Sequence, residues 1–196
     1  CYNFAMNKQL DVLAVGDITT DAFIRLKEAS VSCDIDRKGC RLCMAFADKI
    51  PYEFVEVVRA VGNSPNAAVS ASRLGLSAGL VADIGDDQNG KECIEQLDHE
   101  KVDTTYITAH KQMPTNYHYV LWYEEERTIL VKHQAFPYKF PDVNPPPKWL
   151  YLSSLGGDSE EYHQQIIAYL DKYPEVKLAF QPGTFQIRSD FAQLKE

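Results

Sequence analysis

The chain lacks any apolar run of the roughly 20 residues that a membrane-spanning helix needs. Its first residues also lack the basic-then-apolar layout of a secretory signal, so we expect a cytoplasmic protein without a membrane partner. An excess of basic residues is missing too, because 28 Asp and Glu against 20 Lys and Arg give a formal net charge of −8. This balance disfavours a nucleic-acid partner, although a small anionic ligand would need only a local positive site.

Cysteine is scarce, with five residues at Cys1, Cys33, Cys40, Cys43 and Cys93. In a cytoplasmic protein we expect reduced thiols rather than a disulfide framework. Cys40 and Cys43 form a CxxC, and together with Cys33 they could bind zinc if a fourth ligand were available. No second CxxC or nearby His supplies that ligand, so we predict an ordinary thiol-containing loop, with a metal or redox site as the alternative.

What the chain does have is enough length and apolar content for one domain with a sizeable core, with 196 residues of which 45% are hydrophobic. We expect Met6 to be the natural start, with residues 1–5 upstream of the domain and the domain spanning 6–196. From about residue 60 onward, apolar runs of strand length alternate with amphipathic helical patterns. This alternation predicts an α/β layered fold with a mainly parallel sheet.

Two regions differ from this alternation. Residues 21–27 and 52–60 alternate apolar and polar side chains, as half-buried strands do, and flank a mixed polar stretch at 28–51 that we expect to be a loop or an irregular lid. Residues 117–133 contain two alternating runs joined by three glutamates and predict a β-hairpin. Tyr117, Tyr119 and Tyr123 would share one face of the first of these strands. There they stack on a ring or pack against the lid of a partner, and we favour hydrophobic packing of the sheet.

The stretch VGNSPNAAVSASRLG, residues 61–75, predicts a helix with a short polar entrance. Ser64 suits the N-cap, Pro65 suits the first helical position, and Gly75 ends the helix. The many alanines would let this helix lie close to a sheet. We predict strands at 10–16 and 78–85, and another at 102–108 after the helix of residues 90–100.

Three segments follow one another in a specific order: GDITTD at 16–21, GNSPNAAVSASRLG at 62–75, and ADIGDDQNG at 82–90. In this order and spacing they resemble the ribokinase-like (PfkB) family of carbohydrate and nucleoside kinases, over nearly all of residues 10–187. The resemblance implies a three-layer α/β/α sandwich with a mainly parallel sheet and a small β-sheet lid, whose strands lie near 21–27, 52–60 and 115–133. It also implies a possible homodimer formed through the lid strands.

The resemblance implies that Asp21, Gly62, Asn63 and Asn66 bind the acceptor substrate. The residue types fit a polyol, because a carboxylate accepts hydrogen bonds from hydroxyl groups and an amide both donates and accepts them. Glycine lets the backbone approach a ligand, and strand ends in an open α/β sheet are where ligands bind. The alternative is structural, with Asn63 serving only the helix start and Asp21 capping a turn.

The family's GAGD-type segment, which stabilises the transferred phosphoryl group and carries the catalytic Asp, does not occur in these 196 residues. We therefore predict no catalytic and no metal-binding residue in this chain, while the resemblance implies ATP and Mg²⁺ for the complete enzyme. Val61, Ser64, Pro65 and Lys101 depart from the family pattern.

Three hypotheses remain open. The chain is the acceptor-binding part of a sugar or nucleoside kinase and inactive alone, or it is a non-catalytic sugar-binding or interaction module. In the third hypothesis, the chain is a redox or metal protein because of its cysteine-bearing insert. We favour the first, because a free-standing protein that stops within the fold would leave a sheet edge and apolar surface uncovered.

Overall fold

The structure is a computed structural model that describes residues 9–36, 39–157, 159–183 and 187. Residues 1–5, expected to precede the domain, lie outside the described residues. The chain divides into two compact units. We call them the core unit (residues up to Thr19, Arg59–Asn116 and those from His133 onward) and the strand unit (Thr20–Val58 and Tyr117–Lys132).

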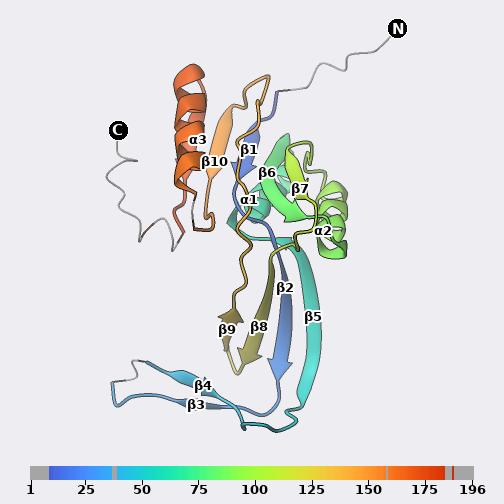
Figure 1. Cartoon of the computed structure of the whole chain (residues 1–196), viewed down its shortest axis with the longest axis vertical. Coiled ribbons are helices and arrows are strands. Elements are labelled where there is room, and N and C mark those ends of the chain that lie inside the picture. Colours follow the sequence, from blue (N-terminus) through green and yellow to red (C-terminus); the bar gives the residue numbers. More distant parts are fainter. Residues whose placement is uncertain (1–8, 37–38, 158, 184–186, 188–196) are drawn as a thin grey trace. The chain divides into compact units, whose positions relative to one another are not determined.

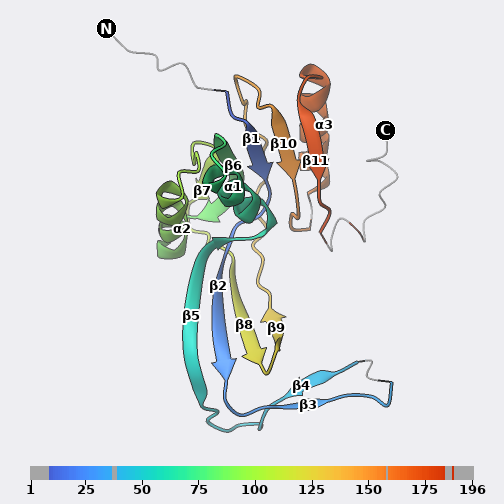
Figure 2. The same ribbon diagram turned by 180° about the vertical axis from the view of Figure 1, so that it is seen from behind.

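The core unit is built on a five-stranded sheet in the order β11-β10-β1-β6-β7 (Figures 1 and 2). Its strands are β1 (Val12–Val15), β6 (Ala78–Gly85), β7 (Ile107–His110), β10 (Trp149–Leu152) and β11 (Lys177–Phe180). Each neighbouring pair in this sheet is parallel. All eight residues of β6 are buried, as expected for a strand covered on both faces.

Helices cover both faces of this sheet. They are α1 (Asn63–Arg73), α2 (Gln88–His99) and α3 (Glu160–Lys172). Leu13 of β1 belongs to a core cluster with residues of α3, whereas its neighbour Ala14 packs in a second cluster with residues of α1 and α2. Successive side chains of a strand point to opposite faces, so β1 supplies both cores. The predicted three-layer α/β/α sandwich with a mainly parallel sheet is confirmed.

The strand unit holds a four-stranded sheet in the order β5-β2-β8-β9. Its strands are β2 (Thr19–Leu26), β5 (Tyr52–Val61), β8 (Tyr117–Tyr123) and β9 (Glu126–Leu130). Strands β8 and β9 pair antiparallel as the predicted hairpin, and β2 pairs parallel with β8. The Trp122 ring of β8 packs edge-on against Phe54 of β5. The guanidinium carbon of Arg25 in β2 lies over the same ring, 4.6 Å from its centroid. Trp122 therefore connects three of the strands.

The cysteine-bearing stretch corrects two expectations. Instead of a loop, it forms an antiparallel ribbon of β3 (Ser30–Ser32) and β4 (Arg41–Cys43). Instead of reduced thiols, Cys33 and Cys40 form a disulfide, while Cys43 is a free, exposed thiol. The register explains the bond, because Ser32 pairs with Arg41 and the next residues along the ribbon are Cys33 and Cys40.

Two element boundaries also differ from the sequence-based expectation. Helix α1 is capped by Gly62, and Ser64 lies inside its first turn with its side chain fully buried. The expected strand at 102–108 is displaced to β7, because Asp103 only bridges to Gly79 and a turn follows it. No helix among the described residues is long and apolar enough to cross a membrane.

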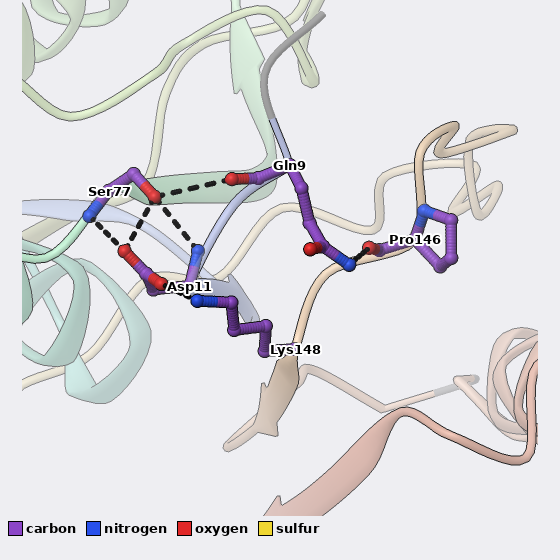
Figure 3. Close-up of polar contacts among 5 residues, drawn as sticks. All are labelled: Gln9, Asp11, Ser77, Pro146 and Lys148. Atoms are coloured by element: carbon purple, nitrogen blue, oxygen red, sulfur yellow. Dashed lines mark hydrogen bonds and ion pairs between the residues drawn. The ribbon is translucent and has the colours of Figure 1, made fainter.

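The amino ends of three strands are tied together by one carboxylate (Figure 3). Asp11 accepts hydrogen bonds from the Lys148 ammonium and from both the backbone amide and the hydroxyl of Ser77. These contacts, led by the Lys148 hydrogen bond, hold the pKa of Asp11 far below its usual range. The sheet is thereby held at the edge opposite its carboxyl ends.

Candidate functional site

The carboxyl ends of β1, β6 and β10 lie at one edge of the parallel sheet, and a polar side chain follows each of them. Strand β1 is followed by Gly16 and Asp17, β6 by Asp86 and Asp87, and β10 by Ser153 and Ser154. In an open parallel sheet, this is the edge where ligands bind.

The segment Gly62–Asn66 opens α1 at this edge. Gly62 has φ 130°, and a Cβ there would lie only 2.7 Å from the backbone oxygen of Asp17. Only glycine fits this close approach without a shift of the backbone. Asn63 and Asn66 are both exposed, and no other described residue hydrogen-bonds to either side-chain amide. The structure therefore brings Gly62, Asn63 and Asn66 together, with both amides open to solvent.

Ser64 anchors this segment from beneath. Its hydroxyl donates to the backbone oxygen of Val15 at 2.6 Å and lies 2.6 Å from the hydroxyl of Ser153. A Cβ at Gly16 would come within 2.6 Å of the Ser64 hydroxyl and 2.8 Å of the Ser153 hydroxyl. The absence of a side chain at residue 16 thus lets β1, α1 and the end of β10 meet closely.

Asp17 receives contacts from the segment that precedes β10. The Tyr138 hydroxyl donates to Asp17 Oδ1 at 2.7 Å and accepts a hydrogen bond from the backbone amide of Gly156 at 3.3 Å. The other carboxylate oxygen, Oδ2, lies 3.8 Å from Nδ1 of His133. Burial, with the charge of Asp17, raises the pKa of Tyr138 well above its usual value, so its hydroxyl stays protonated as a donor.

A second carboxylate–imidazole pair lies between β6 and β7. Nε2 of His110 is 2.6 Å from Oδ1 of Asp83, and the His110 ring stacks on Phe136 with centroids 5.2 Å apart. Burial raises the pKa of Asp83, and the hydrogen bond and charge of His110 offset this only in part. Residues 133–138 therefore contact Asp17 directly and, through the Phe136 ring, the histidine that pairs with Asp83.

Residues 85–90, GDDQNG, connect β6 with α2. Asp87 caps α2 by accepting from the Gly90 amide at 2.9 Å, and it also accepts from the amide and hydroxyl of Thr115 at 3.0 and 2.6 Å. Burial opposes the ionisation of Asp87, but these hydrogen bonds together lower its pKa. A Cβ at Gly85 would lie 2.1 Å from the backbone oxygen of Met113, so this turn has no room for a side chain.

Asp21 belongs to the strand unit, in β2. Its Oδ1 lies 3.3 Å from Nδ1 of His118, the residue that pairs with it across the β2–β8 register. Both side chains are largely buried, with 19% of Asp21 and 12% of His118 exposed. Tyr117 and Tyr119 share one face of β8 with ring centroids 5.2 Å apart.

Sequence reasoning assigned no role to Asp17, His118, His133 or Tyr138. Asp17 directly follows the strand-ending Gly16, which could have signalled its place at the carboxyl edge. Tyr138 and His133 lie more than 100 residues along the chain from Asp17, and no local pattern indicates their contacts. Among the described residues, no group of three or more His, Cys, Asp or Glu is placed to hold a metal ion.

Comparison with known proteins gives one family match. Residues 35–171 match the family described as pfkB family carbohydrate kinase. A fructokinase of Klebsiella pneumoniae is 28% identical over 158 residues, which cover 76% of this chain and 50% of that protein. A 5-dehydro-2-deoxygluconokinase of Bacillus velezensis is 29% identical over 112 residues, which cover 57% of this chain and 28% of that protein. The chain thus spans at most about half the length of these relatives.

Solved structures show the same fold. A ribokinase of Arabidopsis thaliana, complexed with ribose and ATP, matches with a TM-score of 0.68 at 16% identity, covering 88% of this chain and 53% of its own. A ribokinase of Cryptococcus neoformans in complex with ADP matches with a TM-score of 0.64 at 22% identity, covering 94% and 52%. A nucleoside kinase of Methanocaldococcus jannaschii matches with a TM-score of 0.68 at 14% identity, covering 91% and 54%.

Proposed function

Because the chain belongs to the pfkB family of carbohydrate kinases, we propose that it forms the acceptor-binding part of an ATP-dependent kinase for a sugar or nucleoside. In this proposal Asp21, Gly62, Asn63 and Asn66 bind the acceptor. The strand unit would act as a lid that excludes water, which phosphoryl transfer requires.

One observation carries the proposal. Gly62 packs directly against the backbone of Asp17 at the carboxyl edge. The side-chain amides of Asn63 and Asn66, which follow it, are exposed and make no hydrogen bond to another described residue. Solvent-facing amides on a rigid segment can donate to and accept from hydroxyl groups without first breaking internal bonds. Asp21 would add a carboxylate acceptor from the strand unit.

ATP and Mg²⁺ belong to the proposal for the complete enzyme. No cluster of potential metal ligands occurs among the described residues, and the sequence has no GAGD-type segment, so we assign neither group to a residue of this chain. We expect the 196-residue chain to bind an acceptor without transferring a phosphoryl group to it. The cytoplasmic location is part of the same proposal.

The proposal is tested by calorimetric titration of the chain with D-ribose, D-fructose and adenosine, followed by incubation with each of them and radiolabelled ATP. Saturable binding of one of them without phosphorylated product is the expected result. The absence of binding by all three would contradict the acceptor-binding role. Phosphorylated product formed by this chain alone would contradict the assignment of catalysis to residues outside it.

A homodimer through the strand unit is a further part of the proposal. Its strands expose large apolar side chains, namely Tyr52, Phe54, Val55 and Val57 of β5, Tyr119 of β8, and Ile129 and Leu130 of β9. A monomer would leave these side chains in water, whereas a second copy would bury those on the face that it covers. Sedimentation equilibrium should give twice the chain mass, and a monomer at all concentrations would contradict this.

A further inference from the structure

We propose that the core unit has a second small-molecule site, at the amino edge of its sheet, which takes an α-amino acid with an apolar side chain. The site is a hollow of about 390 Å³ beside the starts of β1 and β6. Strand β6 runs from this hollow at Ala78 to the carboxyl edge at Gly85, a path of roughly 23 Å at about 3.3 Å per residue. The hollow is therefore separate from the proposed acceptor site, and the inference does not depend on acceptor binding.

The body of the hollow is apolar. Its apolar lining consists of Leu10, Ala78, Val102, Pro145 and the ring of Tyr106. Gly79 brings part of this lining together, because a Cβ there would lie 2.7 Å from Cδ1 of Leu10 and 3.5 Å from Cβ of Asp103. Small-molecule sites commonly measure roughly 300–1,000 Å³ and combine an apolar lining with a few polar groups that orient the ligand. The size and the lining of this hollow therefore fit a small organic ligand.

Two carboxylates, those of Asp98 and Asp103, also line the hollow. The Thr104 hydroxyl donates to Oδ1 of Asp98 at 3.0 Å, and the backbone amide of Thr105 donates to Oδ1 of Asp103 at 2.9 Å. Asp98 is exposed and Asp103 is half-buried, and no described residue donates to the Oδ2 atom of either. Because no group of three or more metal-ligating side chains occurs in the described part of the chain, these oxygens suit an organic ammonium group rather than a metal ion.

Lys101 and Tyr106 bring donors to the same hollow. Lys101 is exposed, and its ammonium forms no ion pair with any described carboxylate. Its backbone is fixed in the turn after α2, where its amide donates to the backbone oxygen of Asp98 at 3.0 Å. Burial, with the charges of Asp103 and Asp142, raises the pKa of Tyr106, so its hydroxyl stays protonated as a donor. An ammonium and a hydroxyl donor suit the carboxylate of a ligand.

Charges of both signs thus border one apolar hollow without pairing with each other. A ligand that carries an ammonium and a carboxylate group on an apolar body complements all three features at once. A simple amine would leave Lys101 without a partner, and a simple carboxylate would meet Asp98 and Asp103 as like charges. An α-amino acid with an acidic side chain would add a further like charge, so the apolar amino acids fit best.

The competing account is structural. In that account the hollow is a solvent-filled gap between the strand starts and the turn of residues 101–106, and its charged groups are only hydrated. Such a gap would not distinguish an amino acid from its amine or its acid. A binding site would distinguish them, and each charged residue would matter only to ligands that carry the complementary group.

The experiment titrates the ¹⁵N-labelled chain with L-leucine, L-phenylalanine and L-aspartate, and follows the backbone amide signals by NMR. 4-Methylpentanoate, which is leucine without its ammonium group, and 3-methylbutylamine, which is leucine without its carboxylate, are titrated in parallel. The variants are Asp103→Asn and Lys101→Gln. The amide oxygen of Asn still accepts from Thr105, so the turn keeps its hydrogen bond. Glu95→Gln and Lys91→Gln are the matched controls, because both side chains are exposed on α2 and neither lines the hollow.

We expect L-leucine or L-phenylalanine to shift amide signals of residues 77–79 and 98–106 saturably, without shifting those of 62–66. L-Aspartate and both leucine analogues should bind at least about tenfold more weakly, since each lacks or opposes one hydrogen-bonded charge. Asp103→Asn should weaken amino-acid binding about tenfold without weakening that of 4-methylpentanoate. Lys101→Gln should weaken it about threefold, because exposed ion pairs contribute less, and should leave 3-methylbutylamine unaffected. Both controls should bind as the unmodified chain does.

The absence of saturable shifts at residues 77–79 and 98–106 with either apolar amino acid would overturn the inference. Equal affinities for leucine and its two analogues would overturn it in favour of a hydrated gap, and so would unchanged binding in Asp103→Asn. None of these outcomes bears on the acceptor site, whose function is tested by the sugar and nucleoside titrations described above.

Discussion

The hydroxyl of Ser64 in α1 donates a hydrogen bond to the backbone oxygen of Val15, 2.6 Å away at the end of β1. This bond fixes the turn that presents Asn63 and Asn66 to the carboxyl edge. It also explains why a serine stands in the first turn of the helix rather than at its cap. The rigidity of the proposed acceptor site therefore depends on a residue that points away from it.

Ser64→Ala should lower the free energy of unfolding by about 1–3 kcal/mol, because it removes a buried hydrogen-bond donor. Urea denaturation measures the change. Ser70→Ala is the control, since Ser70 lies on the exposed side of the same helix. Equal stability of the two variants would show that the buried bond does not stabilise the junction.

Gly85→Ala should destabilise the chain by about 3 kcal/mol, because the added Cβ would lie 2.1 Å from the oxygen of Met113 and 2.6 Å from the nitrogen of Thr115. Backbone atoms cannot move aside as the end of a flexible side chain can. Gly157→Ala provides the comparison, since a Cβ there meets no atom within 4 Å. A midpoint of thermal unfolding that falls no further in Gly85→Ala than in Gly157→Ala would contradict this.

Asp87→Ala should cost about 2 kcal/mol at neutral pH, through loss of the α2 cap and of the Thr115 hydrogen bonds. The pKa of Asp87 is lowered on folding, so its contribution is present above the unfolded value of about 3.9 and is lost as pH falls through the folded value. The stability difference between the two proteins should therefore shrink below about pH 4. A stability difference that stays constant as the pH is lowered through the acid range would contradict this account.

The cysteines should differ in reactivity. In the absence of reductant, iodoacetamide should label Cys43, which is exposed, while Cys33 and Cys40 remain unlabelled in their disulfide. A reductant should make both available, and buried Cys93 should react only on unfolding. Mass spectrometry of tryptic peptides follows each site. Labelling of Cys33 before reduction would show that the ribbon does not carry the disulfide.

The layered fold was predictable because its signals are local. The mostly apolar sequence of β6 and the alternation along β8 each indicate their strands from a few residues. The ribbon of β3 and β4 was missed because its side chains are nearly all exposed, so no hydrophobic period marks it. The disulfide was missed because the expectation came from the assumed compartment rather than from cross-strand geometry.

The candidate site was predictable only where its residues follow one another. Gly62, Asn63 and Asn66 lie in one segment, and a glycine beside two amides at a helix start is a recognisable pattern. The contact between Asp17 and Tyr138 joins residues 121 positions apart. This contact depends on the segment between residue 133 and β10. Its proline-rich sequence has no hydrophobic periodicity from which its course could be predicted.

Acceptor binding by variants of the proposed site is the most direct test of the account. The dissociation constant of the best-binding sugar or nucleoside would be measured by calorimetry for the unmodified chain, Asp21→Ala and Asn66→Ala. Asp36→Ala and Ser70→Ala are the controls, because both side chains are exposed and lie outside the proposed site. The account predicts binding weakened about tenfold or more in Asp21→Ala, by at least a few fold in Asn66→Ala, and unchanged in both controls. Dissociation constants equal to that of the unmodified chain in both site variants would contradict it.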